Sequence, residues 1–396
     1  MLSLSPGLCP VAILVVAATS LAAQDRKPTP LPELEARARR DSLDATAQYE
    51  LSLGYYRANR PDDEERALRR AIAIDPRYAP AYLSLSYLPF ERRPKLWQEV
   101  RKNKVPAEWR TPVEESRRLV SRAFLIDPLV DLRVLGAAAP KEEMLDVPEY
   151  GSYTTELLLY LGIGAFGAAR YERSFGALQL WVERAYGTKP RDSIPDFLFM
   201  YRGLAAAHLH VNRIAIEDFG TLLERATKRE LSDTLLQIPL QTNDYRYVLA
   251  VLHEVSGKPA DAVRLYQETL AADLGHYMAH VRLAQLYRRF KMWNDAVTEA
   301  QRAVETNPDD ATALLELGVI LAEAGRTGEA EETLLRAQTA NPRDVRSLYH
   351  LGLTQAQAAK STEARANLER FVAVAPSRYS SLVTDARQRL SGLGGQ

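Results

Sequence analysis

The sequence predicts an all-α protein in which pairs of helices stack into a solenoid, and three observations support this. Between Asn243 and Pro376 the pattern of apolar and small residues repeats every thirty-four residues. Each unit holds two apolar-periodic segments of about a dozen residues, joined at a turn that contains Gly or Lys. Three of the four units end in a proline, which cannot continue a helix: Pro308, Pro342 and Pro376.

The repeating positions have the properties that stacked helix pairs require. Small residues allow two helices to approach closely, and an acid at the start of a helix faces the positive end of its dipole. A helix pair cannot bury its apolar face alone, so neighbouring pairs must stack. The recurring residues are Leu249-Ala250, Leu283-Ala284, Leu317-Gly318 and Leu351-Gly352 in the first segments, and Asp261-Ala262, Asp295-Ala296, Glu329-Ala330 and Glu363-Ala364 in the second.

Residues 1–23 are predicted to be a secretory signal peptide. The stretch from Val11 to Ala23 is apolar and alanine-rich, and charge first appears at Asp25, so cleavage after Ala23 would leave Gln24 at the mature N-terminus. A signal anchor is the alternative, although the apolar run is short for a bilayer span. Cleavage would remove the single cysteine, Cys9, and with it any disulfide or thiol nucleophile. We therefore expect an exported protein, periplasmic or secreted, with no stable membrane span after cleavage.

The first part of the mature chain is predicted to be less regular. Residues 24–44 are interpreted as a polar linker and the start of the first helix, and 45–128 as two degenerate units that end at Asp75-Pro76 and Asp127-Pro128. The two Asp-Pro pairs lie fifty-two residues apart, which is eighteen more than one period. We place the extra residues at about 89–112, between the two helices of the second unit, and expect this insertion to lie outside the stacked core.

The insertion is basic and contains two tryptophans. One interpretation is a contact patch for a phosphate, a polysaccharide or an acidic partner. The other is a solvated loop whose tryptophans cover the end of a helix pair, because basic runs are usually solvated faces. The residues of this possible second patch are Arg92, Arg93, Trp97, Lys102, Trp109 and Arg110.

The remaining boundaries follow from proline, charge and periodicity. Residues 129–150 are interpreted as a connection, 151–242 as two less regular helix pairs, 243–376 as the regular array, and 377–396 as a capping helix and tail. The polar outer side of the last helix is the expected way to close the end of a solenoid.

The regular units resemble the tetratricopeptide repeat family. The unit from Ala311 to Pro342 carries the family's pattern most fully, with Leu314, Leu317-Gly318, Leu321, Ala330, Leu334, Ala337 and Pro342. The resemblance implies a right-handed superhelix whose first helices line a concave surface that binds a protein or peptide. It also implies which residues line that groove, namely Tyr247, Val251, Val281, Gln285, Leu315, Val319, Tyr349 and Leu353.

These groove positions are mostly apolar or aromatic. The set of Lys, Asn and Arg with which chaperone-binding members of the family hold a C-terminal carboxylate is not found in this sequence. Two interpretations remain open. The side chains either line a groove for an extended or helical apolar segment, or pack against one another along a tight superhelix.

Motifs for catalysis or for cofactors are weak. Gly162, Gly164 and Gly167 spell the dinucleotide-binding string, but both flanks predict helix rather than a strand and a turn. His276 and His280 could share a helical face as metal ligands, but the sequence supplies no clear third ligand. No P-loop or Gly-x-Ser-x-Gly elbow is present. We therefore predict no enzymatic activity, cofactor or metal, and the net charge of zero gives no field that favours nucleic acid.

The leading hypothesis is an exported, non-enzymatic scaffold that mediates protein–protein interaction through its concave groove. One alternative is a carbohydrate- or envelope-polymer-binding accessory protein that uses the basic insertion. Another is an enzyme built around that insertion. The oligomeric state and the identity of the partner stay open at the level of sequence.

Overall fold

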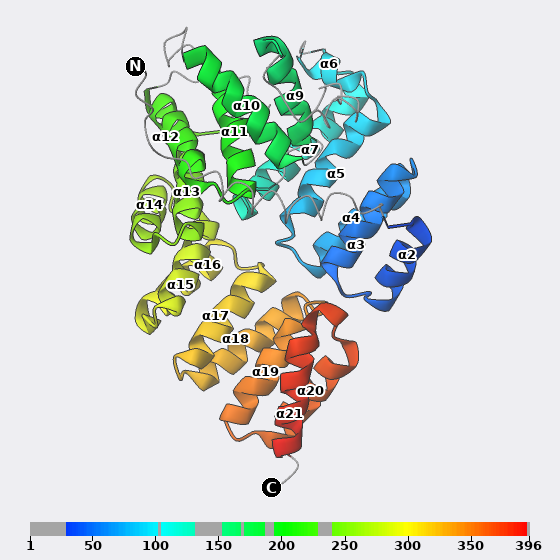
Figure 1. The fold of residues 1–396 in the computed structure, drawn as a ribbon. Helices are drawn as coiled ribbons and strands as arrows, with labels where there is room; N and C mark the ends of the chain where they lie inside the picture. Colours follow the sequence, from blue (N-terminus) through cyan, green and yellow to red (C-terminus); the bar gives the residue numbers. More distant parts are fainter. Residues whose placement is uncertain are drawn as a thin grey trace, which may run out of the picture.

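The computed structural model describes residues 29–101, 104–130, 153–167, 170–186, 194–228 and 240–393, and every regular element within them is a helix (Figure 1). The predicted signal peptide and most of the predicted connection at 129–150 lie outside these residues. Among the described helices, none combines the length and the apolar character needed to cross a membrane.

The described residues form a leading helix, eight consecutive helix pairs, a short helix inserted in the second pair, and a closing helix. The elements are α2 (Leu31–Arg40); the pairs α3 (Ala45–Arg57) with α4 (Pro61–Ile74), α5 (Ala79–Arg92) with α7 (Ala107–Ile126), α9 (Thr155–Gly167) with α10 (Tyr171–Tyr186), α11 (Asp196–His208) with α12 (Asn212–Lys228), α13 (Thr242–Val255) with α14 (Pro259–Ala272), α15 (Tyr277–Arg289) with α16 (Trp293–Thr306), α17 (Ala311–Glu323) with α18 (Thr327–Ala340), and α19 (Arg346–Gln357) with α20 (Ser361–Val374); then a 3-10 turn, η2 (Ser377–Tyr379), and α21 (Ser380–Leu393).

Adjacent helices pack in chain order. From α9 onward, each first helix packs most extensively on its own second helix, and each second helix packs on the first helix of the next pair. In the pairs α17–α18 and α19–α20, the first helix comes close to the second helix at a glycine. A Cβ atom built on Gly318 would lie 2.6 Å from Cγ of Leu334, and one built on Gly352 would lie 2.6 Å from Cγ of Leu368. The small residues therefore allow the helices of a pair to come close together, as the sequence predicts.

The same approach recurs in the less regular pairs. A Cβ atom on Gly162 would lie 2.5 Å from Leu178, and one on Gly203 would lie 3.0 Å from Phe219. In both cases, as for Gly318 and Leu334, the partner lies sixteen residues further along the chain. The pairs α9–α10 and α11–α12 are thus built on the same contact as the regular array, although their sequences echo the repeat only loosely.

In the regular array, the turn inside each pair contains one residue in the left-handed region. Gly257 and Gly325 adopt φ of 70° and 80°, and Lys291 and Ala359 adopt φ of 59° and 58° at the equivalent places. A residue with positive φ ends a helix by turning the chain away from its axis. The thirty-four-residue period therefore extends to the backbone conformation of the turns.

The insertion in the second unit is partly a core element, which corrects the expectation that it lies outside the stack. Helix α6 (Leu96–Arg101) lies between α5 and α7 in the chain, and Leu96 is completely buried in a cluster with Phe90 and Val113. An apolar side chain of this size is stable in the interior because burial removes its surface from water. Length in excess of one period did not distinguish a surface loop from an additional packed helix.

The two ends of the solenoid lie side by side. Figure 1 shows the leading helices α2 to α4 next to α18 to α21, although the chain between them runs through the whole array. A hydrogen bond of 3.0 Å joins the Asn341 side chain to the carbonyl oxygen of Ile74, 267 residues earlier in the chain. The described part of the molecule is therefore closed on itself rather than extended.

Candidate functional site

One candidate site is a cavity of about 680 Å³ on the side of the solenoid formed by the first helices. Its walls come from α13 and α15, from the C-terminal ends of α7 and α11, and from the loop between α4 and α5. Helices of neighbouring pairs bring these residues together although they are far apart in the chain. The lining residues are Arg77, Ile126, Asp127, Leu129, Ala207, His208, His210, Val251, Val255, Met278, Val281, Arg282 and Gln285.

One wall of the cavity is apolar. Val251 and Val255 are four residues apart on α13, and Met278 and Val281 are three apart on α15, so each pair projects from one face of its helix. Val255 lies at the end of α13 and is 55% exposed, whereas Val251 and Val281 are buried. An apolar segment could therefore enter along Val255 and pack against the buried valines.

Two arginines also line the cavity, Arg282 from α15 itself and Arg77 from the loop between α4 and α5. The Nε atom of Arg77 donates to Oδ2 of Asp310 at 3.4 Å, and its Nη2 atom has no hydrogen-bond partner among the described residues. The guanidinium of Arg282 lies 3.9 Å from the carboxylate of Glu254. Neither arginine has a short ion pair that would use all its donors, so both can supply further hydrogen bonds to a ligand.

Aromatic and histidine side chains support the walls. The rings of His208 and Tyr171 are stacked, with centroids 4.1 Å apart. Tyr247 lies behind the cavity, with its ring against Tyr266 and His276. Burial raises the pKa of Tyr247, so this side chain stays neutral and acts as a packing group. The described lining of the cavity combines apolar packing surface with cationic donors, and it contains no Ser, Thr, Cys or Lys that could act as a nucleophile.

The eight groove positions implied by the resemblance do not lie in one open groove. Val251, Val281 and Gln285 line the cavity. Leu315 and Val319 are buried in the cluster that joins α15 to α19. The closing helix covers the last two positions: the hydroxyl of Tyr349 donates to Asp385 on α21 at 2.7 Å, and Leu353 packs in the same cluster. Tyr247 is also buried, so three of the eight positions line the cavity and the other five pack within the protein.

Two arginines of the basic insertion are paired with acids. Arg92 pairs with Asp62 and Glu65 at 2.7 and 2.8 Å, and Arg93 pairs with Glu99 at 2.8 Å and lies over the Trp109 ring. Trp109 packs against the cluster that contains Leu96, and Arg110 is exposed. Lys102 and the side chain of Trp97 lie outside the described residues.

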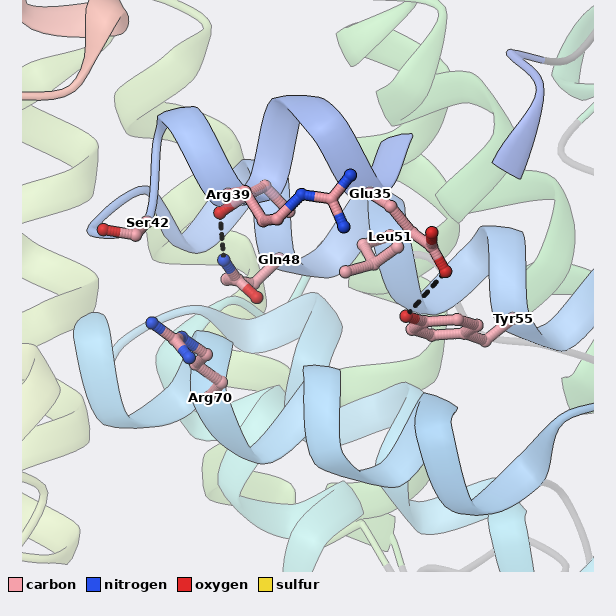
Figure 2. A pocket seen from close by; sticks show the side chains of 8 residues that line it. Glu35, Arg39, Ser42, Gln48, Leu51, Tyr55 and Arg70 are labelled. Atoms are coloured by element: carbon pink, nitrogen blue, oxygen red, sulfur yellow. Dashed lines mark hydrogen bonds between the residues drawn. The ribbon is translucent and has the colours of Figure 1, made fainter. Parts of the chain in front are cut away.

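A smaller pocket of about 360 Å³ lies at the N-terminal end (Figure 2). The Tyr55 hydroxyl donates to Glu35 at 3.2 Å, and the Gln48 amide donates to the Ala38 carbonyl at 3.0 Å. Figure 2 shows Arg39 of α2 and Arg70 of α4 on opposite sides of this pocket. Its lining is mostly polar, so it offers less packing surface for an apolar segment than the larger cavity does.

The weak motifs have structural roles. Gly162, Gly164 and Gly167 lie within α9, where Gly162 makes the close contact to Leu178. His276 caps α15 by accepting a hydrogen bond from the amide of Ala279, and His280 is hydrogen-bonded to Glu299 at 2.6 Å. Among the described residues, no group of three or more His, Cys, Asp or Glu side chains could hold a metal ion.

Sequence reasoning missed the residues that close the cavity. Arg77 follows directly on Asp75-Pro76, and Ile126, Asp127 and Leu129 surround the second Asp-Pro signal. All four lie at the point where a second helix ends and the chain passes to the next first helix. Their position in the repeat was visible in the sequence, but their approach to α13 and α15 depends on the curvature of the whole solenoid.

Comparison with known proteins identifies the repeat. The tetratricopeptide repeat family matches residues 247–293 and 292–345. No curated protein sequence matches this chain. Solved structures that resemble it include MamA from Desulfovibrio magneticus RS-1, with 16% identity over 45% of this chain and 94% of that chain and a TM-score of 0.39.

Two further solved structures show a similar level of likeness. YrrB, titled a tetratricopeptide repeat protein with an unusual peptide-binding site, has 16% identity over 52% of this chain and 97% of that chain, with a TM-score of 0.40. The C-terminal part of a tetratricopeptide-repeat-containing protein from Cytophaga hutchinsonii has 11% identity over 61% and 90%, with a TM-score of 0.47. Identities of this size do not transfer a ligand from one chain to another.

Proposed function

We propose, on the premise that this chain is a tetratricopeptide repeat protein, that it is an exported scaffold that binds a protein or peptide segment in the cavity on its first helices. The repeats themselves support a role in protein interaction and a generally non-catalytic scaffold. The observation that carries the proposal further is the combination of an apolar wall on α13 and α15 with two arginines in one cavity.

The dimensions and chemistry of the cavity fit a short segment of a partner chain. A volume of about 680 Å³ falls within the range of roughly 300–1,000 Å³ that is usual for ligand sites. Buried valines and a methionine would receive one or two apolar side chains, and methionine adapts its shape to different ligands. The arginines would bind carbonyl or carboxylate oxygens of the same segment.

Export is part of the proposal and rests on residues 1–23. The apolar run that ends at Ala23 and the polar stretch that follows are the features that a signal peptidase recognises. N-terminal sequencing of the extracytoplasmic protein should begin near Gln24. Full-length protein that starts at Met1 and stays in the cytoplasm would contradict export without affecting the binding site.

The alternatives receive less support from the described residues. A polymer-binding patch at the insertion would need free cations and an accessible aromatic face, yet Arg92 and Arg93 are paired with acids and Trp109 packs on a core cluster. An enzyme built around the insertion has no observation in its favour among those residues.

A pair of exposed valines provides the test of the binding site. Val255, 55% exposed, lies at the mouth of the cavity, and Val374, 45% exposed, lies at the end of α20, remote from it. A photo-crosslinking residue at 255 should label a discrete partner, and the same residue at 374 should not. Val255→Glu should weaken binding of that partner at least tenfold, or about 1.4 kcal/mol, because the charge would be desolvated against an apolar segment.

The control and the contrary result are equally direct. Val374→Glu adds the same charge at a similar exposure and should leave binding unchanged. Equal labelling at both positions, or equal affinity of both glutamate variants, would place the binding surface elsewhere on the molecule.

A further inference from the structure

The two ends of the solenoid are joined by loops. We use "inter-repeat loop" for the segment that connects the second helix of one pair to the first helix of the next. The loop at residues 41–44 meets the segment at 375–379: Oδ1 of Asp41 accepts hydrogen bonds from the amide of Ser377 at 3.0 Å and from its hydroxyl at 2.6 Å. Where α18 and α4 end, the Asn341 side chain donates to the carbonyl oxygen of Ile74 at 3.0 Å.

Ion pairs add to these contacts. Arg378 lies 3.0 Å from Oδ1 of Asp44. Asp310, whose side chain is 1% exposed, lies 3.4 Å from Arg77 and 4.0 Å from Arg122. The guanidinium of Arg122 also lies over the ring of Tyr277, 5.2 Å from its centroid. We call this set of contacts the clasp. Its N-terminal side consists of residues 41–78 and 122, and its C-terminal side of residues 277, 310, 341 and 377–378.

The contacts of the clasp occur in a regular order. Asp41 meets Ser377, Ile74 meets Asn341, Arg77 meets Asp310, and Arg122 meets Tyr277. As the residue number on the N-terminal side of the clasp rises from 41 to 122, the number of its partner falls from 377 to 277. Two rows of inter-repeat loops and adjoining helix ends therefore lie against each other in opposite directions.

The clasp differs in character from the rest of the core. Extensive helix-to-helix packing within the described residues runs between neighbours along the chain. Across the clasp the contacts are hydrogen bonds, ion pairs and one cation-π contact, made mostly by loop residues, with Leu43 packing beside the last helices as an apolar addition. Small polar interfaces between parts of one chain separate more easily than apolar helix pairs unfold.

We propose that the clasp is releasable: the protein exchanges between the closed form and an open form in which the inter-repeat loops separate while every helix pair stays folded. In a solenoid each pair contacts only its neighbours, so small changes at many interfaces add up to a large displacement of the ends. Arg77 belongs both to the clasp and to the wall of the cavity. Opening the clasp therefore removes Arg77 from the cavity, and a ligand that contacts Arg77 favours the closed form.

The test measures a distance across the clasp in the full chain without any ligand. Cys9, the single cysteine, is replaced by serine, and spin labels are attached at Arg70→Cys on α4 and Arg336→Cys on α18, two exposed positions on either side of the clasp. At low salt the unmodified clasp should give one narrow distance distribution. Salt at about 1 M should add a longer-distance population, because screening weakens the ion pairs.

A clasp variant and a matched control make the test specific. Asn341→Asp keeps the oxygen that accepts the amide of Arg343 but loses the donor to Ile74, and Arg77→Met removes the charge facing Asp310. Together they should raise the longer-distance population at least fivefold, with unchanged helical circular dichroism. The control combines Asn307→Asp, one repeat before Asn341, with Arg387→Met on α21. It makes the same chemical changes outside the clasp and should leave the distance distribution unchanged.

Three results would overturn the proposal. The first is a distance distribution in the clasp variant that superimposes on that of the parent, at low and at high salt. The second is a distance distribution of the labelled protein without clasp substitutions that is already long and broad at low salt, which would mean that the closed form is not populated. The third is a longer distance that appears only together with loss of helix, which would indicate unfolding rather than opening. Because no partner is present, each of these results leaves the proposed binding function to its own test.

Discussion

At the scale of single residues, Gly318 illustrates how one missing side chain positions two helices. A Cβ atom there would lie 2.6 and 2.8 Å from side-chain atoms of Leu334, whereas one on Gly328 would meet nothing within 4 Å. Gly318→Ala should therefore destabilise the protein by about 1–3 kcal/mol through overpacking. Gly328→Ala should stabilise it by up to about 1 kcal/mol, because alanine favours helix over glycine. Urea denaturation of the two variants measures this difference of sign, and equal shifts of the midpoint would contradict the close contact.

A half-buried histidine, His350, makes the stability of the array dependent on pH. Burial, reinforced by the nearby Arg288 and Arg346, lowers the pKa of His350 to about 4 from its usual 6.5. Between about pH 4 and pH 6.5, His350 is therefore protonated in the unfolded chain and neutral in the folded chain. The contribution of neutral His350 is complete above pH 6.5 and is lost progressively as the pH falls towards 4.

Replacement of this histidine isolates its effect. His350→Gln should reduce the drop in unfolding free energy between pH 7 and pH 4 by an amount on the order of 2–3 kcal/mol. Denaturant titrations at a series of pH values measure it. If the two proteins lose stability in parallel across this range, His350 is protonated in the folded state at its ordinary pKa.

At the scale of elements, α6 tests whether the inserted segment belongs to the core. Leu96 is completely buried against Phe90 and Val113, while Leu335 on α18 is 46% exposed. Leu96→Ala should cost about 2–4 kcal/mol, and Leu335→Ala should cost less than about 0.5 kcal/mol. Hydrogen exchange should increase in α5 to α7 and remain unchanged in α17 and α18, because a helix pair couples mainly to its neighbours. A uniform increase along the chain would argue that the solenoid unfolds as one unit.

At the scale of the whole molecule, the clasp should respond to acid. Burial acts to raise the pKa of Asp41, but hydrogen bonds from the Ser377 side chain and backbone, together with Arg40, outweigh it, and the net shift is downward from 3.8. The contribution of ionised Asp41 to closure is therefore complete above pH 3.8 and is lost as the pH falls through the lower folded-state pKa.

The distance across the clasp provides the measurement. Between pH 5 and the acid limit of folding, the longer-distance population should grow before helical circular dichroism is lost. The variant Asp41→Asn should show an elevated open population already at neutral pH and a weaker dependence on acid. An acid response of the same size in this variant would assign the effect to other carboxyl groups.

Much of the local structure follows from the sequence alone. The period of thirty-four residues and the Leu317-Gly318 type of dipeptide predict helix pairs, because a small residue at that place is needed for close approach whatever the rest of the molecule does. The α9–α10 and α11–α12 pairs obey the same rule through Gly162 and Gly203. Three of the predicted groove residues, Val251, Val281 and Gln285, line the cavity because their place on a first helix is also a local property.

The tertiary structure alone decides what lies opposite those residues. The bond between Asn341 and the Ile74 carbonyl, and the approach of Arg77 to Asp310, join segments more than two hundred residues apart. Their meeting depends on the sum of small rotations between successive pairs, and no single pair encodes that sum. The same sum brings Arg77, Ile126 and Leu129 to the cavity, while α21 packs over the array's last pair and covers Tyr349. A periodic pattern specifies how each pair is built, but closure is a property of the curvature of the complete chain.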